Sequence, residues 1–296
     1  MEPGGQLKPP RPSRQRILLR RLVAVVAIVL VGGAVAAAFA LRSSSHAAPP
    51  PTTTVRQLRQ FRIVFPEGFI RAQMAARVQA VVKIATRESR RKVRLSRAAY
   101  LAATAKPRLI PGFGGKKLKI EGFLFPDTYD FDRKTTSAQL VQEQLQEFTS
   151  KWNEVSLSYA RSKNLTPYDV LTIASMVEGE AQVPSERPLV AAVIYNRLHD
   201  HMTLGIDATL RYGLHLKPTQ PLSPYLKSDN PYNTDKFPGL PPTPIDNPGL
   251  AALDAAAHPA HVDYLYFVRK PDRVHHYFTA SFQDFQNHEI QYGFVK

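Results

Sequence analysis

The chain has 296 residues, which is enough for one large domain or for a medium domain with a smaller companion. It contains no cysteine, so disulfides and thiolate metal sites are excluded. The formal net charge of +15 suits an anionic partner, although residues 1–42 alone hold seven basic residues against one acidic residue. The sequence has no zinc-finger spacing, RNP-like aromatic motif or basic leucine-zipper pattern, so we expect no nucleic-acid partner.

The N-terminal segment has the pattern of a membrane anchor. Residues 1–21 form a basic, proline-containing tail, and the twenty residues 22–41 carry no charge, amide or hydroxyl group. Such a helix can cross about 30 Å of hydrocarbon. Arg20 and Arg21 precede it and only Arg42 follows closely, so we predict a single pass over 22–42 with a cytoplasmic N-terminus. The alternative is a cleaved signal peptide, whose apolar core would be shorter.

A spacer and a small folded unit are predicted next. Residues 43–56 are a Ser/Ala/Pro/Thr linker that cannot bury a core. Residues 57–118 are predicted as a small α/β unit with a strand over 61–65 and a helix over 69–87. The run from Lys83 to Arg97 holds seven basic residues and one acidic residue, which indicates a solvated helix face or, alternatively, attraction to an anionic wall polymer.

Residues 119–296 are predicted as a mixed α/β (α+β) domain. Thr166-Pro167 starts a nearly apolar helix over 168–181, and Ser185 starts another. Residues 204–249 are rich in turns. Further helices are predicted over 135–151, 250–257 and 281–288, and strands over 264–268 and 276–279.

Two glutamates near the end of the apolar helix are the candidates for chemistry. Glu180 lies one turn after Met176 and Val177, whereas Glu178 lies over a smaller and partly polar surface. The more apolar surroundings should raise the pKa of Glu180 more, as a general acid requires. Glu180 is therefore the predicted acid and Glu178 the reserve.

Each candidate has a purely structural alternative. One glutamate could pair with Arg187 or Arg197, and Asn196-Arg197 could end a helix. Asp207 and Thr209 could be turn residues. The nine histidines lack metal-ligand spacing, and no GxSxG, P-loop or GxGxxG motif occurs, so we predict neither a metal nor a cofactor.

Eight or more linked motifs resemble one family over about residues 121–279. They are EGFLFPDTY, LTIASMVEGEA, VPSERPLVAAVIYNRL, MTLGIDATLRYG, NPYNT, GLPPTPIDNPG, ALDAAAHPA, YLYFV and HHYFT. In this order they resemble the membrane-anchored endolytic murein transglycosylases of the YceG-like family.

The resemblance implies non-hydrolytic cleavage of peptidoglycan between N-acetylmuramic acid and N-acetylglucosamine. The muramyl C6 hydroxyl attacks the anomeric carbon and leaves a 1,6-anhydro end. One carboxyl can act first as acid and then as base, and the family's catalytic glutamate falls on Glu180. The positions that match substrate-groove motifs are Asn196, Arg197, Asp207, Thr209, Tyr232 and Asn233.

The resemblance also implies a place of action and partners. It predicts an extracytoplasmic catalytic domain at the cytoplasmic (inner) membrane that ends the elongation of nascent glycan strands, beside penicillin-binding proteins and other wall synthases. A LysM-like glycan-binding unit is expected upstream, but residues 57–118 are short for it and only Phe65-Pro66-Glu67-Gly68 is similar.

The sequence departs from the family pattern near the acid. Gly179 stands where a lysine is usual, Gly205-Ile206 where glutamine-threonine is common, and Ala208 where a proline is usual. These departures concern the details of the subsites and leave the acid in place. Two other functions stay open: a non-catalytic wall-binding scaffold, and a hydrolytic muramidase that uses Glu178 or Asp207 as a second carboxylate.

Overall fold

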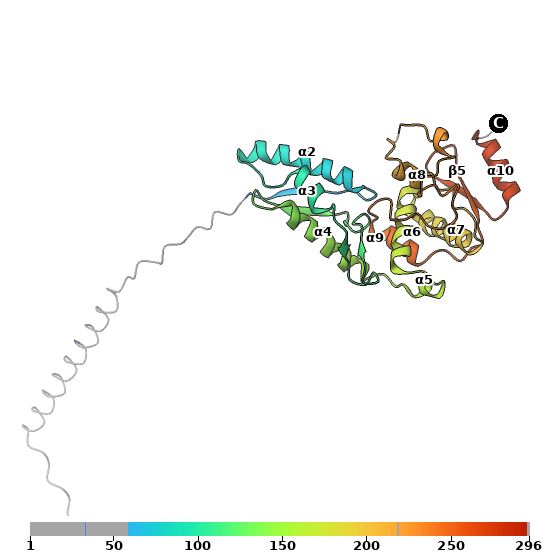
Figure 1. Cartoon of the computed structure of the whole chain (residues 1–296), viewed down its shortest axis with the longest axis horizontal. Coiled ribbons are helices and arrows are strands. Elements are labelled where there is room, and N and C mark those ends of the chain that lie inside the picture. Colours follow the sequence, from blue (N-terminus) through green and yellow to red (C-terminus); the bar gives the residue numbers. More distant parts are fainter. Residues whose placement is uncertain (1–32, 34–58, 218, 295–296) are drawn as a thin grey trace, which may run out of the picture. The chain divides into compact units, whose positions relative to one another are not determined.

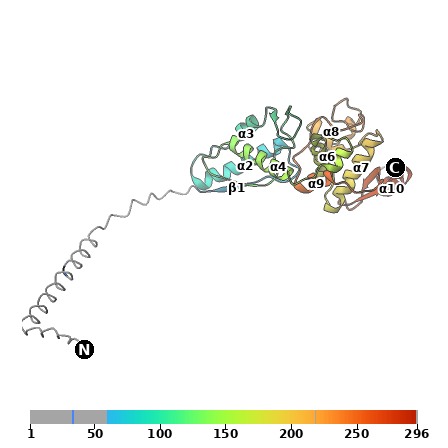
Figure 2. The same cartoon turned by 90° about the horizontal axis from the view of Figure 1, so that it is seen from below.

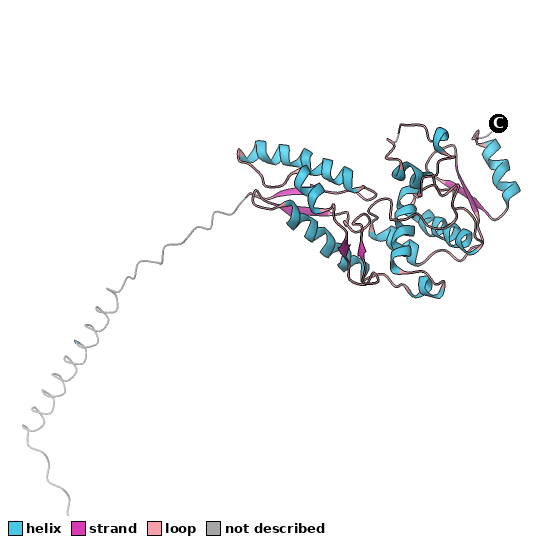
Figure 3. Ribbon diagram, viewed as in Figure 1, coloured by secondary structure: helices cyan, strands magenta, loops and turns pink. Residues whose placement is uncertain are grey.

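Short antiparallel strand pairs and a larger number of helices make up the protein (Figures 1 and 3). The computed structural model describes residue 33, residues 59–217 and residues 219–294. Residues 58–296 form one compact unit whose buried apolar residues all lie within that unit, so this part of the chain can fold by itself. The predicted mixed α/β class is confirmed by this architecture.

No helix among these described residues has both the length and the apolar composition needed to cross a membrane. The predicted span over 22–42 lies outside them, apart from Gly33.

The N-terminal part is built on a two-stranded sheet. Strand β1 (Phe61–Val64) pairs antiparallel with β4 (Thr128–Phe131), so that Phe61 faces Phe131 and Val64 faces Thr128. Helices α2 (Arg71–Ser89), α3 (Arg97–Ala103) and α4 (Ser137–Trp152) pack around it. A smaller pair joins β2 (Arg108–Leu109) to β3 (Lys117–Leu118). The β1–β4 pairing joins segments from both sides of residue 118, the boundary predicted for the small unit.

The predicted helix starts have a clear chemical basis. The Ser96 hydroxyl accepts a hydrogen bond from the Ala99 amide at the start of α3. At the start of α4 the cap is Thr136, which exchanges hydrogen bonds with Gln139. Residues 119–127 form a loop that leads into β4.

The C-terminal part surrounds one buried helix. Helix α6 (Pro167–Glu180) packs against α7 (Arg187–His199), α8 (Asp207–Gly213) and α9 (Leu250–Ala257). Its residues 170–177 are all buried, as expected for a helix with hardly any polar side. Short turns of helix, α5 (Ser158–Ser162), η1 (Pro184–Glu186) and η2 (Ser223–Tyr225), connect these elements.

The chain ends in a hairpin and a surface helix. Strand β5 (Tyr266–Arg269) pairs antiparallel with β6 (His276–Thr279), and α10 (Phe282–Gln291) packs against both strands. These elements agree with the predicted strands and helix.

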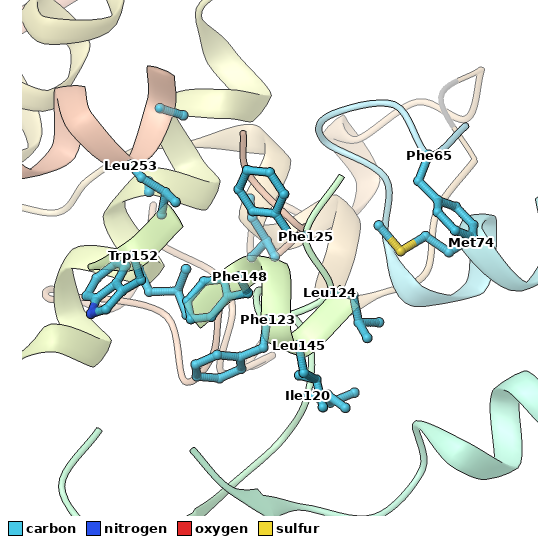
Figure 4. Packing of buried hydrophobic residues seen from close by; sticks show 14 of the residues in the cluster. Phe65, Met74, Ile120, Phe123, Leu124, Phe125, Leu145, Phe148, Trp152 and Leu253 are labelled. Carbon is cyan, nitrogen blue, oxygen red and sulfur yellow. The ribbon is translucent and has the colours of Figure 1, made fainter. Parts of the chain in front are cut away.

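A continuous apolar core connects the two parts. Phe123, from the loop before β4, packs edge-on against Phe148 of α4 at 5.0 Å between ring centroids, and Phe148 stacks on Trp152. Figure 4 shows this cluster with Leu253 of α9 close to it. The buried Asn247 side chain adds polar links, because its Oδ1 accepts from the Gly122 and Leu124 amides and its Nδ2 donates to the Phe69 carbonyl. These contacts join the loops around residues 69, 122 and 247 to one another.

Candidate active site

A pocket of about 430 Å³ opens at the C-terminal end of α6. Its lining combines acidic, basic and aromatic side chains from four separate stretches of the chain. The lining residues are Gly179, Glu180, Gly205, Asp207, Ala208, Arg211, Phe267, Arg269, His276 and Phe294. The pocket therefore brings two carboxylates, two guanidinium groups and one imidazole together.

Glu180 is the last residue of α6, and its partly exposed side chain lines this pocket. Burial raises the pKa of Glu180 to about 7. The nearby Arg269 lowers this pKa, but its effect is smaller than that of burial. The Asp207 carboxylate raises this pKa further, whereas the Ala208 backbone lowers it. A carboxyl at the negative end of a helix dipole also resists ionisation. Glu180 can thus hold a proton near neutral pH and release it.

Glu178 has different surroundings although it is only two residues away. Its Oε1 lies 3.7 Å from Nη2 of Arg187, and its Oε2 accepts a hydrogen bond of 3.1 Å from the Gly249 amide. Burial raises the pKa of Glu178, with a contribution from Glu67, while Gly249 and Arg187 lower it. The pairing with Arg187 that the sequence left open for one of the glutamates therefore belongs to Glu178.

Arg269 comes to the pocket from the end of β5. No carboxylate of the described residues lies within 4.0 Å of its guanidinium. It faces His276 directly across the β5–β6 ladder, so these two side chains lie on the same face of the hairpin. Arg269 is the cation placed to stabilise Glu180 when the latter is ionised.

His276 is held by Glu186, which lies in the turn just after α6. One Glu186 oxygen accepts from the His276 amide at 3.0 Å, and the other lies 2.8 Å from His276 Nδ1. Both residues are buried, and the Phe267 ring packs edge-on against the imidazole at 5.4 Å. Glu186 thus fastens the β5–β6 hairpin to the segment that follows Glu180.

The chain that carries this site is similar to known proteins. A sequence profile of the YceG-like family matches residues 36–291. The chain belongs to the YceG-like family.

Three relatives show how far the similarity extends. An endolytic murein transglycosylase of Bacillus subtilis (strain 168) is 38% identical over 154 residues, which are 52% of this chain and 43% of that protein. One of Streptococcus pneumoniae (strain R6) is 34% identical over 177 residues, which are 57% of this chain and 32% of that protein. The match thus spans less than half the length of either transglycosylase. A crystal structure of a YceG-like protein from Listeria monocytogenes is 28% identical, with a TM-score of 0.62 over 76% of this chain and 74% of that one.

Among the six residues predicted for the groove of this YceG-like protein, Asp207 is the one that lines the pocket with Glu180. It is exposed and is the first residue of α8, so the stretch predicted to be rich in turns over 204–249 contains a short helix at this point. The helix has only seven residues, and such a length shows little periodicity.

Asn196 and Arg197 are used to hold the segment before β5. Asn196 Nδ2 donates to the carbonyls of Val262 and Tyr264, both at 2.9 Å. Arg197 Nε donates to the Leu265 carbonyl at 2.6 Å, and its guanidinium lies over the Tyr266 ring. Asn196 also lines a different hollow of about 500 Å³. Their predicted contact with substrate stays a prediction.

Thr209, Tyr232 and Asn233 shape the loop behind the pocket. Thr209 and Asn233 are fully buried; the Thr209 hydroxyl bonds Thr234, and Asn233 Nδ2 donates to the Leu226 and Ser228 carbonyls. The Tyr232 hydroxyl shares a hydrogen bond of 2.7 Å with Thr243. Direct contact of Thr209 or Asn233 with a substrate would require this loop to open.

Two buried acids beneath α6 were not foreseen. Asp246 is 5% exposed and its Oδ1 has no hydrogen-bond partner in the described part of the chain, while burial raises its pKa well above the usual range. Burial also raises the pKa of Glu121 to about 7, although Arg71, Asn247 and Tyr212 donate hydrogen bonds to it. Glu121 lies in the loop before β4 and Asp246 in the turn-rich stretch before α9, and neither segment has a periodic pattern that would indicate a buried acid.

The residues that the structure describes contain no cluster of three or more His, Asp or Glu side chains arranged to hold a metal ion. Arg269, Arg211 and His276 are the pocket residues that sequence reasoning missed. The motifs YLYFV and HHYFT adjoin Arg269 and contain His276, so the resemblance pointed to the right hairpin without showing which side chains enter the site.

Proposed function

We propose that this protein is an endolytic lytic transglycosylase that cleaves peptidoglycan glycan strands between N-acetylmuramic acid and N-acetylglucosamine. One observation carries this proposal: a pocket-lining Glu180 whose pKa is raised to about 7 by burial, beside a Glu178 that is paired elsewhere. The names of the Bacillus and Streptococcus relatives support the same activity.

The reaction needs one carboxyl in two roles. Protonated Glu180 donates its proton to the glycosidic oxygen as the bond from that oxygen to the muramyl C1 breaks. The resulting carboxylate is stabilised by Arg269 and then accepts the proton of the C6 hydroxyl. The O6–C1 bond forms, which leaves a 1,6-anhydromuramyl end and restores protonated Glu180.

A hydrolytic muramidase is the second candidate, because Asp207 lines the same pocket as Glu180. A hydrolase uses a second carboxylate as nucleophile or to activate water. Asp207 would take that role, and the product would then carry a reducing end.

The cellular setting belongs to the same proposal. We propose that residues 22–42 anchor the protein in the cytoplasmic membrane with a cytoplasmic N-terminus and an extracytoplasmic catalytic domain. The uncharged run and its flanking arginines support this assignment. The enzyme would act there as a terminase of glycan elongation beside penicillin-binding proteins.

The test is mass spectrometry of peptidoglycan digested by residues 43–296, with Glu180→Gln and Glu178→Gln beside the wild type. We expect anhydromuramyl ends from the wild type, none from Glu180→Gln, and a reduced amount from Glu178→Gln. Reducing ends from the wild type would assign hydrolysis instead. If the wild-type protein is folded and sediments with the wall but cleaves nothing, the protein is a non-catalytic wall-binding scaffold.

A further inference from the structure

One end of the N-terminal part carries a concentration of cations, which we call the basic end. It comprises the last turn of α2, the segment from there to α3, and the loop after β4. Its cationic residues are Lys83, Arg87, Arg90, Arg91, Lys92, Arg94, Arg97, Arg133 and Lys134. All of them are exposed except Arg133, which is half-buried.

The charge of the basic end is not neutralised within the described part of the chain. None of these side chains forms an ion pair there. The two neighbouring carboxylates are already engaged: Glu88 pairs with Arg59 at 2.7 Å, and Asp132 accepts hydrogen bonds from the Lys134 and Thr135 amides. The cations are therefore free to meet an external anion.

The basic end also has a defined shape. A hollow of about 800 Å³ is lined by residues 92–96 together with Arg133 and Lys134, and it contains no carboxylate. Val93 and Leu95 are buried while Lys92 and Arg94 point outward, as alternation along an extended segment requires.

Backbone contacts hold the two walls of this hollow together. The Arg94 amide donates to the Arg133 carbonyl at 3.1 Å, and the Ser96 amide donates to the Ser137 hydroxyl at 3.2 Å. The cations are thus presented on a fixed surface rather than on a free tail.

The basic end lies where the chain enters the folded unit. Arg59, two residues before the start of β1, contacts Glu88 at the end of α2. Within residues 59–294, α8 and α10 lie at the opposite end from the start of β1 in both views (Figures 1 and 2). Fifteen residues, 43–57, separate the predicted membrane span from Leu58.

We infer that the basic end docks on the anionic phospholipid headgroups of the membrane. Phosphate groups match the clustered Arg and Lys side chains, and a basic surface close to an anionic leaflet is attracted by about 1 kcal/mol per residue. Ile84 adds an apolar contact, because it is 53% exposed on the α2 face that carries Arg87. The choice of lipid over other polyanions rests on the proposed anchor.

Docking in this way has a consequence for the enzyme. It sets the end of the domain that carries Glu180 away from the bilayer, so the pocket is presented to glycan strands outside the headgroup layer. The docking surface and the pocket use different residues, so a failure of one leaves the other testable.

The experiment measures flotation of residues 58–296 with phosphatidylcholine vesicles that do or do not contain phosphatidylglycerol. The test variant is Lys92→Gln/Arg94→Gln/Arg133→Gln/Lys134→Gln. The control removes the same charge elsewhere, as Lys106→Gln/Lys116→Gln/Lys117→Gln/Lys119→Gln, which are all exposed and carry no ion pair among the described residues. Circular dichroism checks that each protein is folded.

We expect salt-sensitive binding to the anionic vesicles only, an affinity loss of about tenfold or more in the test variant, and a much smaller loss in the control. Equal losses in the two variants, or no binding at low salt, would overturn the inference. Binding of the wild type to isolated wall polymer but not to vesicles would also overturn it and assign the surface to that polymer. Cleavage of peptidoglycan by the test variant, measured in parallel, reports separately on the proposed function.

Discussion

Glu178 and Glu180 lie two positions apart on one helix and have different partners. Their helical phase alone indicated that Glu180 faces a more apolar surface, and the pocket at Glu180 agrees with this expectation. The phase could not show that Arg187 and the Gly249 amide bind Glu178, because Gly249 lies on a distant segment. The pocket position of Glu180 was thus predictable from helical phase, whereas the partners of Glu178 were not.

The pH dependence of cleavage should report on Glu180 and Arg269. Because the first step needs protonated Glu180, activity should fall as pH rises above about 7. In Arg269→Gln the ionised form loses its stabilising cation, so the pKa of Glu180 rises and this alkaline limb moves upward by about one pH unit.

The matched control for this prediction is Arg211→Gln. Arg211 lines the same pocket but is not among the groups that shift the pKa of Glu180, so the alkaline limb should stay in place. Profiles of kcat/KM against pH for the three proteins provide the measurement. An unmoved limb in Arg269→Gln would show that Arg269 does not act on the acid.

At the level of elements, the β5–β6 hairpin is joined to the turn after α6 by the contact between His276 and Glu186. The two strands of the hairpin were predicted from their apolar and aromatic composition, and both are found within two residues of the expected positions. Their docking onto the site was not predictable, because Glu186 and His276 are 90 residues apart in sequence. The position of Arg269 depends on this long-range pair.

Replacing Glu186 by Gln should loosen the hairpin. We expect the free energy of unfolding to fall by about 1–3 kcal/mol, because a buried charge-assisted hydrogen-bond pair loses its charge. The alkaline limb of activity should also move upward, in the direction expected for Arg269→Gln, since Arg269 is no longer held near Glu180.

Urea unfolding and the pH profile check this prediction, with Asp254→Asn as the control. Asp254 pairs with His258 at 3.0 Å at an exposed site, where such a pair contributes at most about 1 kcal/mol. If Glu186→Gln lowers stability without moving the limb, the pair has only a structural role.

At the level of the whole molecule, three acids with raised pKa values make stability depend on pH. The folded-state pKa values of Glu121 and Glu180 are raised to about 7, and that of Asp246 is raised well above 3.8. The folded protein therefore binds more protons than the unfolded chain. The extra protons stabilise the folded protein fully at pH values below the unfolded-state pKa values of these acids. This stabilisation is lost as the pH rises through their folded-state pKa values.

We accordingly predict that the free energy of unfolding of residues 58–296 decreases between pH 5 and pH 8. Asp246→Asn removes one of the protonated groups, so the free energy of unfolding of this variant should fall less steeply with pH, by up to about 1.4 kcal/mol per pH unit. Urea unfolding at a series of pH values tests this. A slope identical to that of the wild type would mean that Asp246 is ionised in the folded state.

The sequence by itself determined the family, the mixed α/β class and most helices and strands of the C-terminal part, and it predicted Glu180 rather than Glu178 as the acid. These features depend on local patterns: helical phase, caps, and the order of linked motifs. The tertiary structure decided which distant groups join Glu180 and why Asn196, Arg197, Thr209 and Asn233 are held by backbone carbonyls or buried threonines. It also decided that the exposed cations of the segment after α2 and of the loop after β4 line one hollow. The physical reason is that periodicity records how one element is buried, whereas contacts between elements depend on packing across long sequence separations.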